Sequence, residues 1–334
     1  MPGGLVPLIN RVEAEGLKFG IWFEPEMISP DSDLFRLHPD WHVHVRGREP
    51  MLGRNQYVLD VSRSDVRDAV WTQMEKILAN GHISYLKWDF NRNITDAGSA
   101  LLPADQQTEF FHRFILGTYD LMERLVTKFP NILFENCSGG GGRFDPAMLY
   151  YSPQIWASDN TDPIERLYIQ FGTSLCYPAS AVGAHVSACP RTCYQTKGYV
   201  AMWGTFGYEL DPRKLSDDDR QIIRQQVAMY HDTYDLIHNG DLYRLVSPFD
   251  NAFRAVWQFV AENKSRTMVT VVTMRMDYIP HTLVRLRGLD PDGFYENEAT
   301  GQRYSGALLM NAGLNLTYTA NRDGDSAVLL FRKV

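Results

Sequence analysis

The sequence predicts an α/β protein with two parts: a parallel sheet covered by helices in residues 1–240 and an antiparallel β domain in residues 241–334. Up to residue 240, short apolar runs alternate with segments of helical period, which is typical of parallel strands with helices outside them. After that point the runs are short, rich in β-branched residues and separated by Gly, Pro, Asn and Asp, which indicates antiparallel strands.

Five apolar runs of the first part are expected to be strands: residues 17–23, 82–90, 131–136, 154–159 and a short one within 178–185. Polar residues stand at or near the ends of four of them, namely Glu24, Asp89, Asn136 and Asp159. Ligand sites form at this edge both in (β/α) barrels and in doubly wound sheets, so the pattern leaves these two architectures open.

Four helices are expected between these strands and after them, at residues 64–80, 104–129, 161–175 and 216–238. In the first helix, Val66, Val70, Ile77 and Leu78 share one face. In the last helix, Ser216 followed by Asp219 resembles a capping box. Its expected buried stripe is Ile223, Val227, Tyr230, Tyr234 and Ile237.

The second part is expected to be a small antiparallel sandwich. Its clearest strands are residues 266–274, 314–319 and 327–334.

Composition excludes several classes of protein. The net charge is -7 and no run of Lys and Arg occurs, so a nucleic-acid partner is not expected. No apolar window of membrane-spanning length occurs and no signal peptide is visible, so we expect a cytoplasmic protein without a membrane partner. The cysteines Cys137, Cys176, Cys189 and Cys193 are too few for a disulfide framework. They are expected to be free, buried thiols, with a bridge or metal site at Cys189 and Cys193 as the alternative. The spacing of His38, His42 and His44 matches no zinc pattern, so no metal is expected.

The segment 85–92, YLKWDFNR, carries the strongest local signal. In a strand, Lys87, Asp89 and Asn91 point to one face and the residues between them to the other. Polar groups on the inner face of an apolar strand are costly unless they are satisfied or used. Asp89 is therefore a candidate nucleophile or base, and a structural Lys–Asp pair is the alternative.

Three further segments carry candidate groups. Asp159 ends a strand, but it is also a residue type that caps helices. The turn in residues 135–145, ENCSGGGGRFD, lacks the spacing of a nucleotide-binding loop and suits a neutral ligand beside Cys137 and Gly139, or a plain loop. Near Trp22, Glu24 and Glu26 are rival catalytic carboxylates, or bond neighbouring backbone or Arg groups.

Four segments together, KFGIWFEPEM, YLKWDFNR, ENCSGGGGRFD and WASDNTD, closely resemble glycoside hydrolase family 36, the bacterial α-galactosidases of the melibiase type. The resemblance covers most of residues 1–240, and the β module after it resembles the C-terminal sandwich of that family. It implies a (β/α)8 TIM-type barrel as domain 1–240 and an antiparallel β-sandwich as domain 241–334. Relatives have two barrel strands and a paired-aspartate motif before the first of these segments, so the barrel is expected to be incomplete, with its first two strands missing.

The resemblance also implies roles. Asp89 matches the nucleophile of the family and Asp159 its general acid/base. The implied substrate-binding residues are Trp22, Arg54, Lys87, Asn91, Cys137 and Gly139. The implied activity is retaining hydrolysis of α-galactosyl residues from melibiose- and raffinose-type oligosaccharides through a covalent intermediate, without a cofactor.

Other functions remain open at this stage. They are a related specificity, α-N-acetylgalactosaminidase or galactosyl transfer, and an impaired fragment that is structural or binds carbohydrate weakly. The resemblance also leaves room for a homo-oligomer.

Overall fold

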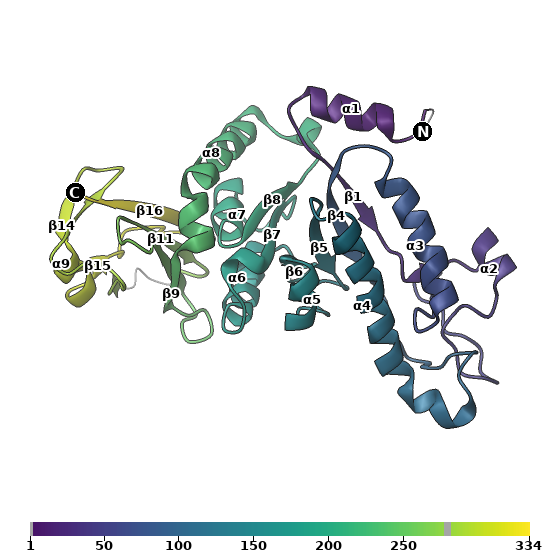
Figure 1. Cartoon of the computed structure of the whole chain (residues 1–334). Helices are drawn as coiled ribbons and strands as arrows, with labels where there is room; N and C mark the ends of the chain where they lie inside the picture. Colours follow the sequence, from purple (N-terminus) through teal and green to yellow (C-terminus); the bar gives the residue numbers. More distant parts are fainter. Residues whose placement is uncertain (1–2, 277–281) are drawn as a thin grey trace. The chain divides into compact units, whose positions relative to one another are not determined.

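The structure is a computed structural model that describes residues 3–276 and 282–334 (Figure 1). The chain divides into two compact units, Met1–Trp156 and Ala157–Val334, and each has its own core.

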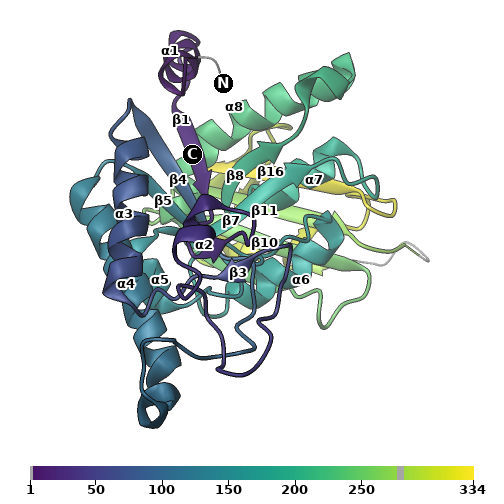
Figure 2. The ribbon, with the colours of Figure 1, turned by 90° about the vertical axis from the view of Figure 1, so that its right-hand side faces the viewer.

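The first unit is built on four parallel strands in the order β1 (Phe19–Phe23), β4 (Ile83–Asp89), β5 (Leu133–Cys137) and β6 (Gln154–Trp156). These strands confirm the four expected there, although the last is shorter. Two helices, α3 (Ser64–Leu78) and α4 (Phe110–Lys128), lie side by side along the sheet (Figures 1 and 2). The parallel α/β character expected for this part of the chain is confirmed.

Helix α3 buries a face that differs by one residue from the expected one. Val66, Val70 and Leu78 are buried as expected, but Met74 takes the place of Ile77. Met74 lies four residues after Val70 and four before Leu78, so it continues the same stripe along the helix.

The remaining elements of this unit are short connections. They are α1 (Val6–Ala14), β2 (Met27–Ile28), α2 (Asp33–Leu37), β3 (Tyr57–Val58), the 3₁₀ turn η1 (Ala104–Glu109) and α5 (Pro146–Tyr151). The long helix expected at 104–129 thus begins as a 3₁₀ turn and becomes α-helical at residue 110.

The second unit begins with parallel strands β7 (Val182–Ser187) and β8 (Thr205–Glu209). Around them lie α6 (Pro163–Thr173), α7 (Tyr194–Ala201) and α8 (Asp217–Asn239), with short 3₁₀ turns η2 (Ala179–Ala181) and η3 (Pro212–Lys214) (Figure 1). The helices expected at 161–175 and 216–238 are confirmed.

Helix α8 begins where the capping signal places it, and its buried stripe was predicted only in part: Ile237 is buried and Tyr230 is partly buried, as expected. The side-chain oxygen of Ser216 accepts a hydrogen bond from the Asp219 N–H at 3.1 Å. Val227 and Tyr234 are exposed, whereas Gln226 and Thr233 are buried together with Leu236 and Ile237. The buried face therefore includes polar residues that an apolar pattern cannot detect.

The last strands form an antiparallel sheet in the order β14 (Arg303–Ser305), β13 (Phe294–Asn297), β16 (Ser326–Lys333), β11 (Arg266–Thr273), β10 (Arg254–Val260) and β9 (Asp241–Val246). A two-stranded sheet joins β12 (Leu283–Val284) to β15 (Leu314–Asn315), and α9 (Gly306–Asn311) precedes β15. The antiparallel character is confirmed, but the strand expected at 314–319 has only two residues. The domain boundary at residues 240 and 241 stays a prediction.

Strands β10 and β11 are buried on both faces. One face packs on α6, α7 and α8 through residues such as Trp203 and Trp257. The other face packs on the smaller strands and α9 through residues such as Val271 and Leu309. Because both faces are covered, β10 is buried at every position.

A glycine on α4 allows close packing inside the first unit. A Cβ at Gly117 would lie 1.9 Å from the carbonyl oxygen of Val61, so we expect Gly117→Ala to lower the free energy of unfolding by about 2 kcal/mol or more. The matched control is Gly172→Ala on α6, where the nearest atom, on Phe249, is 4.0 Å away. That variant should gain up to about 1 kcal/mol. Denaturant unfolding of the full chain measures both, and equal stability of the two variants would contradict this packing.

Candidate active site

One face of β4 carries the candidate residues to the carboxyl end of the first sheet. Alternation places Lys87 and Asp89 on the same face. The strand register aligns Lys87 with Trp22 on β1 and with Glu135 on β5, and it aligns Asp89 with Cys137. Aligned residues of neighbouring parallel strands share a face, so these five residues gather around one end of the sheet.

The carboxylate of Asp89 is held by three donors. Its Oδ1 accepts the backbone N–H of Phe90 at 2.9 Å. Its Oδ2 accepts Nδ2 of Asn91 at 2.6 Å and the indole Nε1 of Trp22 at 3.2 Å. Asp89 is only 7% exposed, so these bonds fix the direction of a largely desolvated acceptor. Trp22 itself is about half exposed and presents its ring to solvent.

The amide of Asn91 joins Asp89 to two other loops. Its Nδ2 also donates to Oε1 of Glu24 at 2.9 Å, and its Oδ1 accepts the N–H of Gly139 at 3.1 Å. Asn91 and Gly139 were expected to face a ligand, but here each binds the other. Their contact with a sugar therefore stays a prediction, and their role in holding Asp89 is an additional one.

Lys87 pairs with a buried carboxylate on the next strand. Its Nζ lies 3.1 Å from Oε1 of Glu135, and 4.7 Å from the ring centroid of Trp156. Glu135 is fully buried and also accepts hydrogen bonds from the hydroxyl of Tyr85, at 2.7 Å, and from Gln154. Lys87 was expected on this face, but its partner Glu135 was not. Tyr85, Lys87 and Asp89 are alternate residues of one strand, and this spacing was the signal that the inner face holds a row of polar groups.

Asn136 was expected among the polar groups at the strand ends that form the site, and this expectation is wrong. The side chain of Asn136 is buried, and its Nδ2 lies 3.6 Å from the sulfur of Met148 on α5. Because alternate residues point to opposite faces, Glu135 and Cys137 share the face of Asp89 and Asn136 does not.

Cys137 lies beside Asp89 as a neutral thiol. Burial, together with the negative charge of Asp89, raises the pKa of Cys137 to about 12. The turn that follows needs glycine, since Gly139 and Gly140 have φ values of 52° and 81°. No atom lies within 4 Å of a Cβ placed on Gly139, so this side of the turn is open.

The two rival carboxylates have different partners. Glu26 is fully buried and forms a bidentate ion pair with Arg143 at 2.7 and 2.9 Å. Its Oε1 also accepts from the indole of Trp88 at 2.8 Å, so Glu26 ties the glycine-rich turn to the core. Glu24 accepts from Asn91 and from Nη1 of Arg54 at 2.9 Å, which places Arg54 at the edge of the Asp89 network.

Asp159 belongs to the second unit and does not cap a helix. The cap of α6 is Asp162, whose carboxylate accepts the N–H groups of Ile164 at 2.9 Å and Glu165 at 3.1 Å. Asp159 lies three residues before this cap, and its side chain is exposed. The interpretation of Asp159 as a helix cap is therefore wrong.

The backbone around Asp159 is braced on both sides. The N–H of Asn160 donates to the hydroxyl of Ser158 at 3.1 Å. The buried guanidinium of Arg166 donates to the Ser158 carbonyl at 2.9 Å and to the Gly183 carbonyl at 3.1 Å. Burial lowers the pKa of Arg166 to about 10, and the charges of Glu209 and Asp159 act in the opposite direction. The convergence of Asp159 with Asp89 stays a prediction.

Among residues 3–276 and 282–334, no three His, Cys, Asp or Glu side chains form a group that could hold a metal ion. His38 stacks on Trp41, and His42 stacks on His44. No helix in the described part of the chain is long and apolar enough to cross a membrane. The four cysteines are free thiols as expected, but only Cys137 is buried; Cys189 is partly exposed and Cys176 and Cys193 are exposed, so the expectation of burial is wrong for these three.

Comparison with known proteins gives a consistent family match. Residues 1–240 match the Melibiase family model, and residues 254–331 match the model of the glycosyl hydrolase family 36 C-terminal domain. The chain is 48% identical over 339 residues to α-galactosidase AgaA of Geobacillus stearothermophilus, covering 99% of this chain and 46% of AgaA. It is 50% identical over 319 residues to α-galactosidase Mel36A of Lactobacillus acidophilus, covering 93% of this chain and 43% of Mel36A.

The fold matches as closely as the sequence. The crystal structure of an AgaA variant in complex with raffinose superposes with a TM-score of 0.96 and 47% identity. This match covers 100% of the present chain and 47% of that one. The chain thus spans about half the length of the curated relatives it matches.

The raised pKa of Cys137 predicts selective alkylation. A pKa of about 12 in place of the ordinary 9.0 leaves on the order of 1,000-fold less Cys137 in the reactive thiolate form at neutral pH. Burial of the thiol slows its reaction further. Iodoacetamide at pH 8 should therefore label the exposed Cys176 and Cys193 at least about 100-fold faster than Cys137, as followed by peptide mass spectrometry. In urea all of these cysteines should react at similar rates. Similar rates in the folded chain would contradict the assigned environment of Cys137.

Proposed function

The chain belongs to the melibiase family, glycoside hydrolase family 36, and from that membership we propose that it carries the catalytic residues of a retaining α-galactosidase. Asp89 is the proposed nucleophile and Asp159 the proposed general acid/base. The proposed substrate is a terminal α-galactosyl residue of an oligosaccharide of the melibiose or raffinose type. AgaA, the relative crystallised with raffinose, supports this substrate class.

The proposed reaction has two steps. In the first, a carboxylate oxygen of Asp89 forms a bond to the anomeric carbon as the glycosidic bond breaks, and Asp159 gives its proton to the departing oxygen. In the second, Asp159 takes a proton from water, and the water oxygen displaces Asp89 from the anomeric carbon. Two inversions leave the released galactose in the α configuration. This reaction requires the two carboxyl groups about 5–5.5 Å apart.

The observation that carries the proposal is the fixed carboxylate of Asp89. Hydrogen bonds from Trp22, Asn91 and the Phe90 N–H orient it, as a nucleophile requires. The uncharged thiol of Cys137 lies beside it and suits a neutral sugar. The braced turn that carries Asp159 suits a group that must hold its position through both steps.

Around this pair we propose a galactose subsite. Trp22 supplies an aromatic wall, Lys87 and Arg54 supply cationic donors, and Cys137 with Gly139 lines the opposite side. Aromatic rings suit the apolar face of a sugar, and charged donors bind its hydroxyl groups strongly. No organic cofactor or metal takes part in this chemistry.

Four other expectations from the sequence stay predictions. They are the absence of the first two barrel strands, the cytoplasmic location, a homo-oligomer, and the specificity for galactose over N-acetylgalactosamine or galactosyl transfer.

Azide rescue distinguishes the two proposed carboxylates. Asp89→Ala should abolish hydrolysis of p-nitrophenyl α-galactoside, and azide should restore turnover by direct attack, giving β-galactosyl azide. Asp159→Ala should still form the covalent intermediate, so azide should give α-galactosyl azide. Loss of a general acid/base typically costs about 10²–10⁴-fold in rate. Proton NMR of the products identifies the anomer.

Asp162→Ala is the matched control. It removes the cap of α6 three residues from Asp159 and should cost about 1 kcal/mol of stability without any azide product. An azide product from this control, or the same anomer from both catalytic variants, would refute the assigned roles. No turnover by the wild-type chain beside an active full-length relative would favour a chain that only binds carbohydrate.

A further inference from the structure

The loop Met51–Gln56, which carries Arg54, has an unusual backbone. Arg54 and Asn55 have φ values of 53° and 59°, so two successive residues with side chains adopt the left-handed conformation. This region is unfavourable for residues other than glycine and persists where surrounding contacts impose it. Backbone bonds between Gly53 and Gln56, at 3.1 and 3.0 Å, close the turn.

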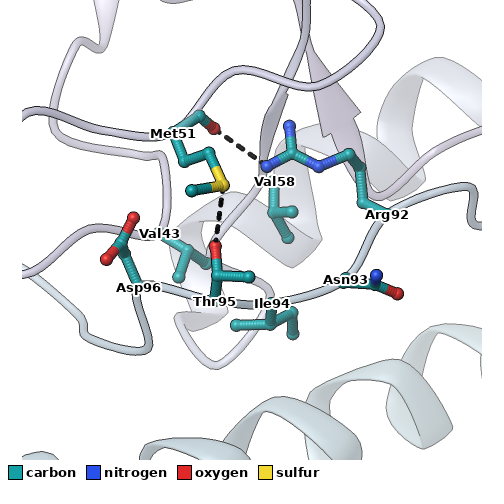
Figure 3. A pocket seen from close by; sticks show the side chains of 8 residues that line it. All are labelled: Val43, Met51, Val58, Arg92, Asn93, Ile94, Thr95 and Asp96. Carbon is teal, nitrogen blue, oxygen red and sulfur yellow. Dashed lines mark hydrogen bonds between the residues drawn. The ribbon is translucent and has the colours of Figure 1, made fainter.

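The contacts that impose this backbone come from Arg92. Its guanidinium donates to the carbonyl oxygen of Met51 at 2.9 Å, that of Gln56 at 2.5 Å and that of Gly53 at 3.4 Å. Figure 3 shows the bond from Arg92 to the Met51 carbonyl. A Cβ on Gly53 would lie 2.8 Å from Nε of Arg92, so glycine at this position lets the guanidinium reach the loop.

A shallow hollow lies beside the loop, and Met51, Arg92, Val43 and Val58 are among its lining residues (Figure 3). Val43 and Val58 belong to the core of the first unit. Met51 is about half exposed, and its sulfur accepts a hydrogen bond from the hydroxyl of Thr95 at 3.2 Å. Arg92 makes three of the polar contacts that the loop forms with the rest of the unit.

The tip of the loop reaches the nucleophile network. Nη1 of Arg54 lies 2.9 Å from Oε1 of Glu24, and the same oxygen accepts from Asn91 at 2.9 Å. The Glu24 side chain is 7% exposed, whereas that of Arg54 is 55% exposed. Arg54 is thus anchored at one end on a buried acceptor and remains accessible to a ligand.

We propose that Arg92 is a positioning residue: it holds the loop Met51–Gln56 in its left-handed turn, so that Arg54 faces the sugar beside Asp89. This inference rests on the proposed function for its effect on the substrate. Arg92 follows Asn91 directly, so the segment just after the strand of Asp89 also holds the loop that carries Arg54.

The first test reports on the loop without activity. Lysine lacks the planar fork that reaches several carbonyls, so Arg92→Lys should release the loop. Trypsin should then cleave after Arg54 at least about tenfold faster than in the wild-type chain, relative to cleavage after the exposed Arg48. Peptide mass spectrometry follows both sites.

Arg67→Lys is the matched control for this test. Arg67 also donates to two backbone carbonyls, those of Val61 and Ser62, and pairs with Asp120, but it does not touch the loop. It should leave the cleavage ratio unchanged. An unchanged ratio in Arg92→Lys, or the same increase in both variants, would overturn the proposal.

The second test measures coupling to Arg54 through kcat/KM for p-nitrophenyl α-galactoside. Arg92→Lys alone should lower kcat/KM by about tenfold or more, mainly through KM. In an Arg54→Ala background the same change should cost less than about twofold, because the group it positions is absent. If the double variant lost kcat/KM by the product of the two single-variant losses, the proposal would be overturned. If the wild-type chain shows no turnover, the proposed function fails, and the cleavage ratio still decides whether Arg92 holds the loop.

Discussion

The arrangement around Asp89 depends on one amide group. Asn91 has two donor hydrogens and one acceptor oxygen, and the structure commits them to Asp89, Glu24 and the Gly139 N–H. These partners come from β4, from the end of β1 and from the glycine-rich turn. Asp89 and Glu24 accept hydrogen bonds and the Gly139 N–H donates one, so the amide fits in only one orientation. This fixes the segment after β1 and the glycine-rich turn relative to the carboxylate of Asp89.

Strand periodicity was enough to predict which residues of β4 share the site, because alternation depends on local sequence alone. The partner of Lys87 could not be predicted in this way. Its carboxylate, Glu135, lies on another strand, and only the register between strands brings the two together. The helix cap was misassigned for a related reason: Asp159 and Asp162 are the same residue type, and the sequence does not reveal where the helix begins.

The buried stripe of α8 shows how tertiary contacts override an apolar pattern. Gln226 is buried because its amide donates to the carbonyls of Tyr194 and Gln195 and its oxygen accepts the hydroxyl of Tyr208. A buried amide with all these partners costs little, whereas Val227 next to it lies on the exposed face. A polar residue on the inner face of a helix is predictable only when its partners are known.

The antiparallel sheet has a consequence for how this chain can be divided. Trp257 on β10 packs against Trp203 and Phe171, so the same apolar cluster supports the helix that follows Asp159 and the sheet that follows residue 240. Expressing either piece alone would leave these aromatic rings in water and invite aggregation. Grafting or exchanging the C-terminal strands between relatives would therefore require matched aromatic residues on both sides of the junction.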